Sequence, residues 1–128
     1  MAAYRYDHIH FRSEDPHAAR KFWEDMFGAE MVRERELGGA PSFDFDLHGM
    51  RFLVSGKAEN EDPVRTGSDP RYGLDHLGLL VDDMDAAAAE LRAKGAEFIC
   101  EPWELRPGTK IAFIKGPDNI SIELAERK

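Results

Sequence analysis

The chain has 128 residues and a formal net charge of −8, with 42% hydrophobic and 33% charged residues. That length suits one domain with a buried core, and the acidic balance argues against nucleic acid or an anionic membrane surface as a partner. No apolar run approaches the roughly 20 residues that span a bilayer, no signal-peptide core is present, and Cys100 alone cannot form an internal disulfide. We therefore expect a cytoplasmic protein.

The first half of the chain combines strand-like segments with one amphipathic stretch. Residues 6–11 predict a strand that carries His8 and His10 on one face. A helix is expected to begin at Pro16, with an aspartate as its N-cap, and to end at Gly28. Three further strands are predicted at residues 31–36, 42–47 and 50–54.

The second half repeats this order after a connection. Glycine, proline and charged residues fill residues 56–73, which is typical of a linking segment. A strand is predicted at residues 74–81 and a helix at about 85–94, with a glycine as its stop. The remaining predicted strands are residues 97–101, 110–115 and 120–125.

An internal repeat relates the two halves. The hexapeptide Tyr6-Asp7-His8-Ile9-His10-Phe11 matches Leu74-Asp75-His76-Leu77-Gly78-Leu79, and both copies later reach Gly-Ala-Glu. A repeat of half the chain is too long for a solenoid unit and too short for an independent domain. We predict an α+β fold in which two tandem βαβββ modules, residues 4–55 and 74–126, form a curled mixed sheet around a concave metal-binding cavity, all within one domain.

Three polar residues of these strands could bind a metal. Glu123 alternates with apolar neighbours, so it would project from the same side as His76 if that apolar set packs on the second helix. His8 would join them if the sheets curl around a common pocket. Two imidazoles and one carboxylate suit a divalent first-row metal with open coordination positions. Each residue alone is more often structural or solvated, but the repeat favours one metal ion, which could be Fe, Mn, Ni, Co or Zn.

These stretches resemble the vicinal oxygen chelate superfamily, which includes glyoxalase I, methylmalonyl-CoA epimerase, extradiol dioxygenases, fosfomycin-resistance proteins and bleomycin-binding proteins. The resemblance covers nearly the whole chain, and its matching segments are residues 6–11, 22–28, 74–81, 108–118 and 122–124. It implies that His8, His76 and Glu123 are the metal ligands. It also implies chelation of vicinal oxygens by a metal that acts as a Lewis acid.

Two residues depart from the pattern of particular subfamilies. Glyoxalase-like and epimerase-like members usually add a fourth ligand, Glu or Gln, from the fourth strand, where this chain has Leu53. Extradiol dioxygenases use a His-His-Glu set but normally place a tyrosine where this chain has Phe113. The resemblance therefore implies that Leu53 and Phe113 contact the substrate, and the subfamily stays open.

Other polar residues could act in the same cavity. His10 shares the face of His8 and could be an acid or base, and Asp44 and Asp46 alternate with apolar residues and should face the cavity. A carboxylate near a metal-bound carbonyl substrate is a natural base, although both aspartates could equally be solvated. Arg51 could pair with them or hold an anionic substrate, and the pairing is favoured.

The function expected from these residues is metal-dependent proton transfer on a small oxygen-chelating carbonyl substrate, of the isomerase or lyase type. One alternative is an Fe(II)-dependent extradiol-type dioxygenase. Another is a metal-free binding protein of the bleomycin-resistance type, against which the intact set of two histidines and a glutamate counts. A homodimer is also expected, because folds of this type commonly pair.

Overall fold

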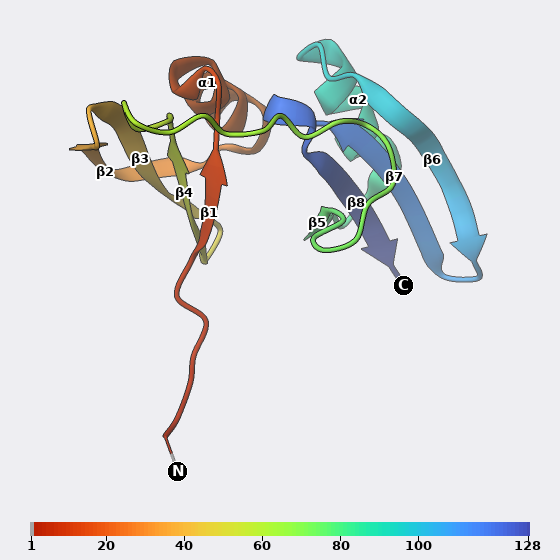
Figure 1. The fold of residues 1–128 in the computed structure, drawn as a ribbon. Coiled ribbons are helices and arrows are strands. Elements are labelled where there is room, and N and C mark those ends of the chain that lie inside the picture. Colours follow the sequence, from red (N-terminus) through yellow and green to blue (C-terminus); the bar gives the residue numbers. More distant parts are fainter. Residues whose placement is uncertain (1) are drawn as a thin grey trace. The chain divides into compact units, whose positions relative to one another are not determined.

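The computed structural model describes residues 2–128, and its elements follow the order βαβββ twice (Figure 1). The elements of the first module are β1 (Ile9–Arg12), α1 (Pro16–Phe27), β2 (Glu30–Leu37), β3 (Ala40–Leu47) and β4 (Met50–Ser55). Those of the second are β5 (Leu77–Leu80), α2 (Met84–Ala93), β6 (Phe98–Arg106), β7 (Thr109–Lys115), a 3₁₀ turn (Pro117–Asn119) and β8 (Ser121–Arg127). The predicted α+β fold with two βαβββ modules is confirmed.

The described chain forms two compact units, with the boundary between Val64 and Arg65. Each unit has its own four-stranded sheet, in the orders β1-β4-β3-β2 and β5-β8-β7-β6. In each module the helix carries the chain from the first strand, at one edge of the sheet, to the second strand at the other edge. Two antiparallel pairings then lead back to the last strand, which pairs parallel to the first. The predicted mixed sheet is thus present as two four-stranded sheets, one in each module, and neither is closed. No helix within residues 2–128 is long and apolar enough to cross a membrane.

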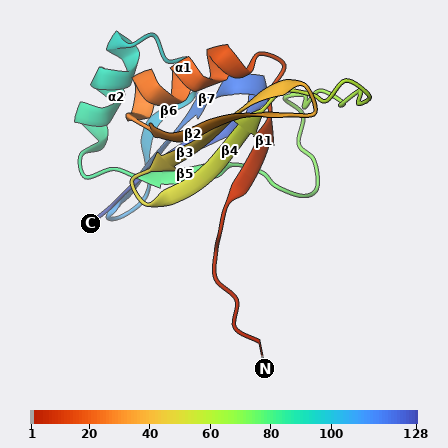
Figure 2. The same ribbon diagram turned by 90° about the vertical axis from the view of Figure 1, so that its left-hand side faces the viewer.

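Helix α1 covers one face of the first sheet (Figure 2). The Asp15 carboxylate accepts a hydrogen bond from the Ala18 amide at the start of the helix, and Gly28 ends it in the left-handed conformation at φ 69°. On the buried side, the ring centroids of Trp23 and Phe52 lie 4.9 Å apart, and both residues are fully buried. The opposite, helix-free face of this sheet is called the open face below.

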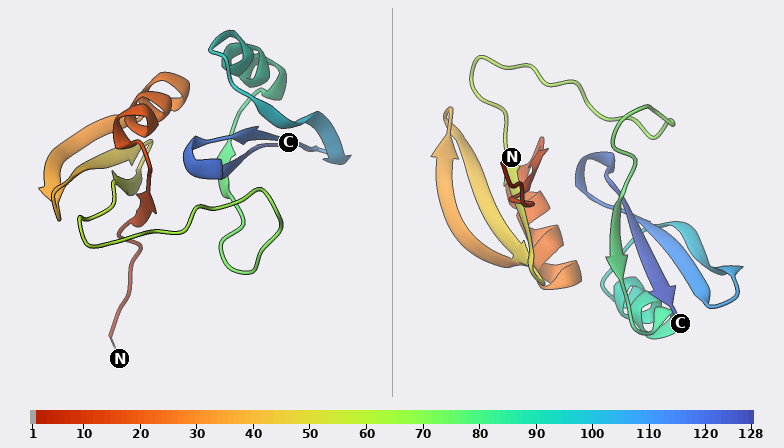
Figure 3. Two further views of the ribbon diagram at one scale, coloured as in Figure 1. Left: turned by 45° about the horizontal axis from the view of Figure 1, so that its top comes forward. Right: turned by 90° about the horizontal axis from the view of Figure 1, so that it is seen from below.

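Helix α2 covers one face of the second sheet in the same manner (Figure 3). Asp83 accepts from the Ala86 amide and caps the helix. The buried Glu126 side chain on β8 accepts a hydrogen bond of 2.9 Å from the Met84 amide, which ties the helix start to the sheet. The face of this sheet that α2 leaves uncovered is likewise called its open face.

Three element boundaries differ from the sequence prediction by three residues or more. β1 begins at Ile9 and β5 at Leu77, so His8 and His76 each lie immediately before a strand rather than inside it. β6 continues through Pro102 to Arg106, well beyond residue 101. A proline is tolerated there because β6 is an edge strand with several register shifts.

Candidate metal and substrate site

The pairing of the strands gives each open-face residue of one module an equivalent in the other. His10 lies opposite Leu53 across β1 and β4, and Gly78 lies opposite Glu123 across β5 and β8. Leu53 and Glu123 therefore occupy matching positions, as His10 and Gly78 do. Of the two matched positions on the last strands, only that of the second module carries a metal-binding side chain.

The second unit brings two of the predicted ligands together. The Nε2 atom of His76 lies 3.5 Å from the Oε1 atom of Glu123. Ile122 and Leu124, on either side of Glu123, are fully buried beneath α2, so the carboxylate points to the open face. Phe113, which was predicted to contact the substrate, packs edge-on against the His76 ring, with 5.2 Å between the ring centroids.

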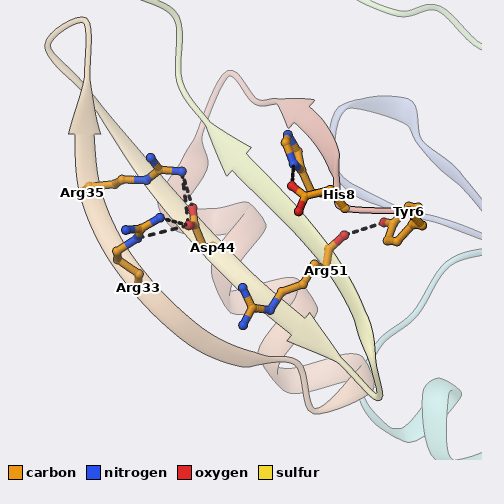
Figure 4. Close-up of polar contacts among 7 residues, drawn as sticks. Tyr6, His8, Arg33, Arg35, Asp44 and Arg51 are labelled. Carbon is orange, nitrogen blue, oxygen red and sulfur yellow. Dashed lines mark hydrogen bonds and ion pairs between the residues drawn. The ribbon is translucent and has the colours of Figure 1, made fainter. Parts of the chain in front are cut away.

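Each predicted metal-binding histidine is held by the aspartate that precedes it. Asp7 Oδ2 lies 2.6 Å from His8 Nδ1 (Figure 4), and Asp75 Oδ2 lies 2.7 Å from His76 Nδ1. A carboxylate can only accept from a neutral imidazole, so this contact places the proton on Nδ1 and leaves the Nε2 lone pair for a metal. The Asp-His dipeptide is repeated in the sequence and could have indicated this role.

No group of three or more His, Cys, Asp or Glu side chains that could hold a metal ion is formed within residues 2–128. The first unit offers His8, whose side chain is 44% exposed, and the second offers the pair formed by His76 and Glu123. The donor types suit a divalent first-row metal, because neutral imidazole and carboxylate are its ordinary ligands.

Asp44 is not a free carboxylate. Its side chain is only 8% exposed and accepts hydrogen bonds from Arg33 and Arg35 on the neighbouring strand (Figure 4). The shortest nitrogen–oxygen distances are 3.2 Å to Arg33 and 3.1 Å to Arg35. Both carboxylate oxygens are thus engaged by guanidinium groups, so Asp44 is not free to approach a substrate. Sequence reasoning missed both arginines.

His10 lies on the open face and is more available for proton transfer. Its Nε2 atom is 2.6 Å from the Ser55 hydroxyl oxygen. Partial burial, followed by the charge of Arg12, lowers the pKa of His10 below its ordinary value of 6.5, and the charge of Asp44 opposes this shift only in part. The lowered pKa favours the neutral imidazole, which is the form that can accept a proton.

Asp46 and Arg51 lie together at the end of the β3–β4 hairpin. Asp46 Oδ1 accepts from the Gly49 amide at 2.8 Å, and Asp46 Oδ2 lies 4.0 Å from Arg51 Nε. The Arg51 carbonyl accepts a hydrogen bond from the Tyr6 hydroxyl at 2.5 Å (Figure 4). Arg51 was predicted either to pair with an aspartate or to hold an anionic substrate, and the structure contains the pairing with Asp46.

The structure places this chain in the class of α+β proteins that are built from two matched βαβββ modules, and each module has a histidine immediately before its first strand. The chain belongs to the Glyoxalase/Bleomycin resistance protein/Dioxygenase superfamily, whose family model matches residues 5–124. The predicted superfamily is thereby confirmed.

Several lactoylglutathione lyases are similar in sequence. A probable lactoylglutathione lyase of Synechocystis sp. is 31% identical over 129 residues, which cover 93% of this chain and 92% of that protein. Two Arabidopsis thaliana relatives, a probable chloroplastic lactoylglutathione lyase and lactoylglutathione lyase GLX1, are 28% and 26% identical, and this chain spans only 35% and 44% of their lengths.

Solved structures show the same fold. A glyoxalase family protein from Enterococcus faecalis matches with a TM-score of 0.80 and 22% identity, over 95% of this chain and 97% of that one. The fosfomycin resistance protein FosX from Listeria monocytogenes, complexed with Mn(II) and sulfate, matches with a TM-score of 0.72 and 15% identity, over 99% of this chain and 95% of that one.

Proposed function

We propose that this chain is a metal-dependent enzyme that transfers a proton on a small carbonyl substrate with vicinal oxygens, in an isomerase or lyase reaction. His8, His76 and Glu123 are the proposed ligands of one divalent ion. The observation that carries the proposal is the approach of His76 Nε2 to Glu123 Oε1 at 3.5 Å, with Asp75 holding the other ring nitrogen. Two ligands that share one ion through bonds of about 2.1 Å lie only a few ångströms apart.

The names of the relatives support the choice of reaction. Those named lactoylglutathione lyase share up to 31% identity with this chain, and the FosX structure, which shares the fold, contains Mn(II). A bound divalent ion supplies Lewis acidity that stabilises negative charge on neighbouring substrate oxygens.

Within this chain, His10 is the proposed base. Its lowered pKa favours the neutral ring, and its contact with Ser55 orients the imidazole. Asp44 and Asp46 were the other candidates from the sequence. The two arginines on Asp44 and the turn amide on Asp46 engage their carboxylates, which favours His10 for accepting a proton from the carbon next to a carbonyl.

Hydrogen exchange in D₂O tests this function directly. The metal-loaded protein is expected to exchange the hydrogens next to the carbonyl of small hydroxycarbonyls such as hydroxyacetone and glycolaldehyde, measured as loss of their ¹H NMR signals. A chelator should stop the exchange, and His10→Gln should slow it by a factor of about 10² or more. Exchange that persists with chelator would contradict the proposal. Oxygen uptake with a catechol in its place would favour the Fe(II) dioxygenase, which the three-ligand set also permits.

We also propose that the chain forms a homodimer. Sedimentation at tens of micromolar protein is expected to give twice the 14.5 kDa mass of the chain. A monomer mass at that concentration would reject this part of the proposal.

A further inference from the structure

The open faces of the two sheets differ in chemistry at matching positions. The polar residues on the open face of the first module include His10, Arg33, Arg35, Ser42, Asp44 and Ser55. Strand pairing assigns their equivalents in the second module as Gly78, Cys100, Trp103, Ile111, Phe113 and Ala125. The central helix-facing positions are apolar in both modules: Phe43, Phe45, Phe52 and Val54 in the first, and Ala112, Ile114, Ile122 and Leu124 in the second. The contrast between the modules therefore lies on the open faces. These six residues of the first module are called the polar face below.

Two hydrogen-bond donors of the polar face are buried without a partner. Ser42 is fully buried, and its hydroxyl has no hydrogen-bond partner. The Nε atom of Arg35 is also buried and unpaired, although Nη2 of the same guanidinium donates to Asp44. Ser42 and Arg35 lie opposite each other in the β2–β3 pairing, so the two free donors are neighbours. Buried polar groups are nearly always satisfied, which makes two adjacent exceptions informative.

The charge of the polar face selects the kind of ligand. Asp44 compensates only one of the two guanidinium groups that contact it, so one positive charge remains in excess. The chain as a whole carries −8, which makes this a local exception. The arginine Nε–H can only donate, and an unpaired serine hydroxyl is free to donate. A group that accepts hydrogen bonds and carries negative charge satisfies both requirements.

We propose that the polar face binds an anionic oxygen group of the substrate, with Ser42 and Arg35 as the donors. Asp44 is a positioning residue there, because it holds the guanidinium of Arg35 in place while its Nε–H stays free. Carboxylate and phosphate share this chemistry. Calling the ligand a substrate rests on the proposed function, whereas the binding of an anion does not.

An NMR titration of the zinc-loaded full chain tests this site. Sodium acetate and inorganic phosphate are added separately at constant ionic strength, and the signals followed are the backbone amides of Ser42 and Ser55 and the Nε–H of Arg35. Saturable shifts at these signals are expected with at least one anion. A response to acetate assigns a carboxylate, and a response to phosphate alone assigns a phosphoryl group.

Two conservative variants localise the binding. Ser42→Ala removes the hydroxyl, and Arg35→Lys keeps the charge beside Asp44 but removes Nε. Each should weaken anion binding about tenfold or more, as expected for one hydrogen bond to a charged group. Matched controls in the second module are Ser121→Ala and the exposed Arg106→Lys, and both should bind as the wild type does.

Two results would overturn the inference. One is a wild-type protein whose polar-face signals do not move with either anion. The other is unchanged anion affinity in both Ser42→Ala and Arg35→Lys, with amide spectra that show intact folding. Zinc content measured on the same samples separates the two proposals. Anion binding without stoichiometric zinc would sink the metal site alone, whereas zinc without anion binding would sink the polar face alone.

Discussion

Replacing His76 with alanine is expected to weaken the binding of a divalent metal by more than about a hundredfold. Removing a residue that only hydrogen-bonds to a metal ligand usually lowers metal affinity by about 10–100-fold. Removing a ligand itself should lower the affinity further. His8→Ala and Glu123→Ala should act in the same way, because all three side chains are proposed to share one ion. Metal content of protein purified without chelator, measured by elemental analysis, checks this directly.

A graded series of variants makes the result specific. Asp75→Asn keeps the imidazole of His76 but replaces the carboxylate that accepts from its Nδ1–H, so an intermediate loss of affinity of about 10–100-fold is expected. His48→Ala is the matched control, because His48 is exposed and its ring lies 3.1 Å from the Phe27 carbonyl oxygen at the end of α1, away from the proposed ligands in sequence. Stoichiometric metal in all three ligand variants would contradict the assignment.

Much of the fold could be predicted because local signals agree with it. The Asp15-Pro16 start and the Gly28 stop of α1 depend on neighbouring residues alone, and both are present in the structure. The repeated hexapeptide likewise indicated two equivalent modules. The hexapeptide could not predict where the first strand of each module begins, because a strand exists only where a partner strand pairs with it. In the structure this pairing begins at Ile9 and at Leu77.

The polar face could not be predicted for a related reason. β2 carries charged residues on both sides, so its sequence does not indicate which of them faces the helix. The pairing of β2 with β3 also contains a register shift between Met31 and Arg33. Such a bulge reverses the face of every residue that follows it. Only the structure therefore places Arg33 and Arg35 on Asp44 and assigns the unpaired donors to one surface.

Leu53 has the second large expected effect, on the reaction with the methylglyoxal–glutathione adduct. It occupies the position that matches Glu123, between His10 and Asp44 in the strand pairing. The neighbouring Phe52 and Val54 are buried against α1, so Leu53 is on the open face. The resemblance to glyoxalase-like members implies a fourth metal ligand at this position. We expect the wild type to turn over this adduct weakly or not at all, despite its similarity to lactoylglutathione lyases.

Leu53→Glu and Leu53→Gln should each tighten metal binding and raise lactoylglutathione lyase activity by at least about tenfold, since either side chain can add an oxygen ligand to the proposed three. A new carboxylate at this position, beside Asp44, could form an ion pair with Arg35 in place of binding the metal. The glutamine variant avoids this outcome, because a neutral amide interacts more weakly with a guanidinium group. Leu53→Ile is the apolar control and should behave as the wild type. Both quantities are measurable on one preparation, by metal titration and by formation of the thioester product. Robust turnover by the wild type would contradict the prediction, and it would mean that three ligands suffice for this reaction.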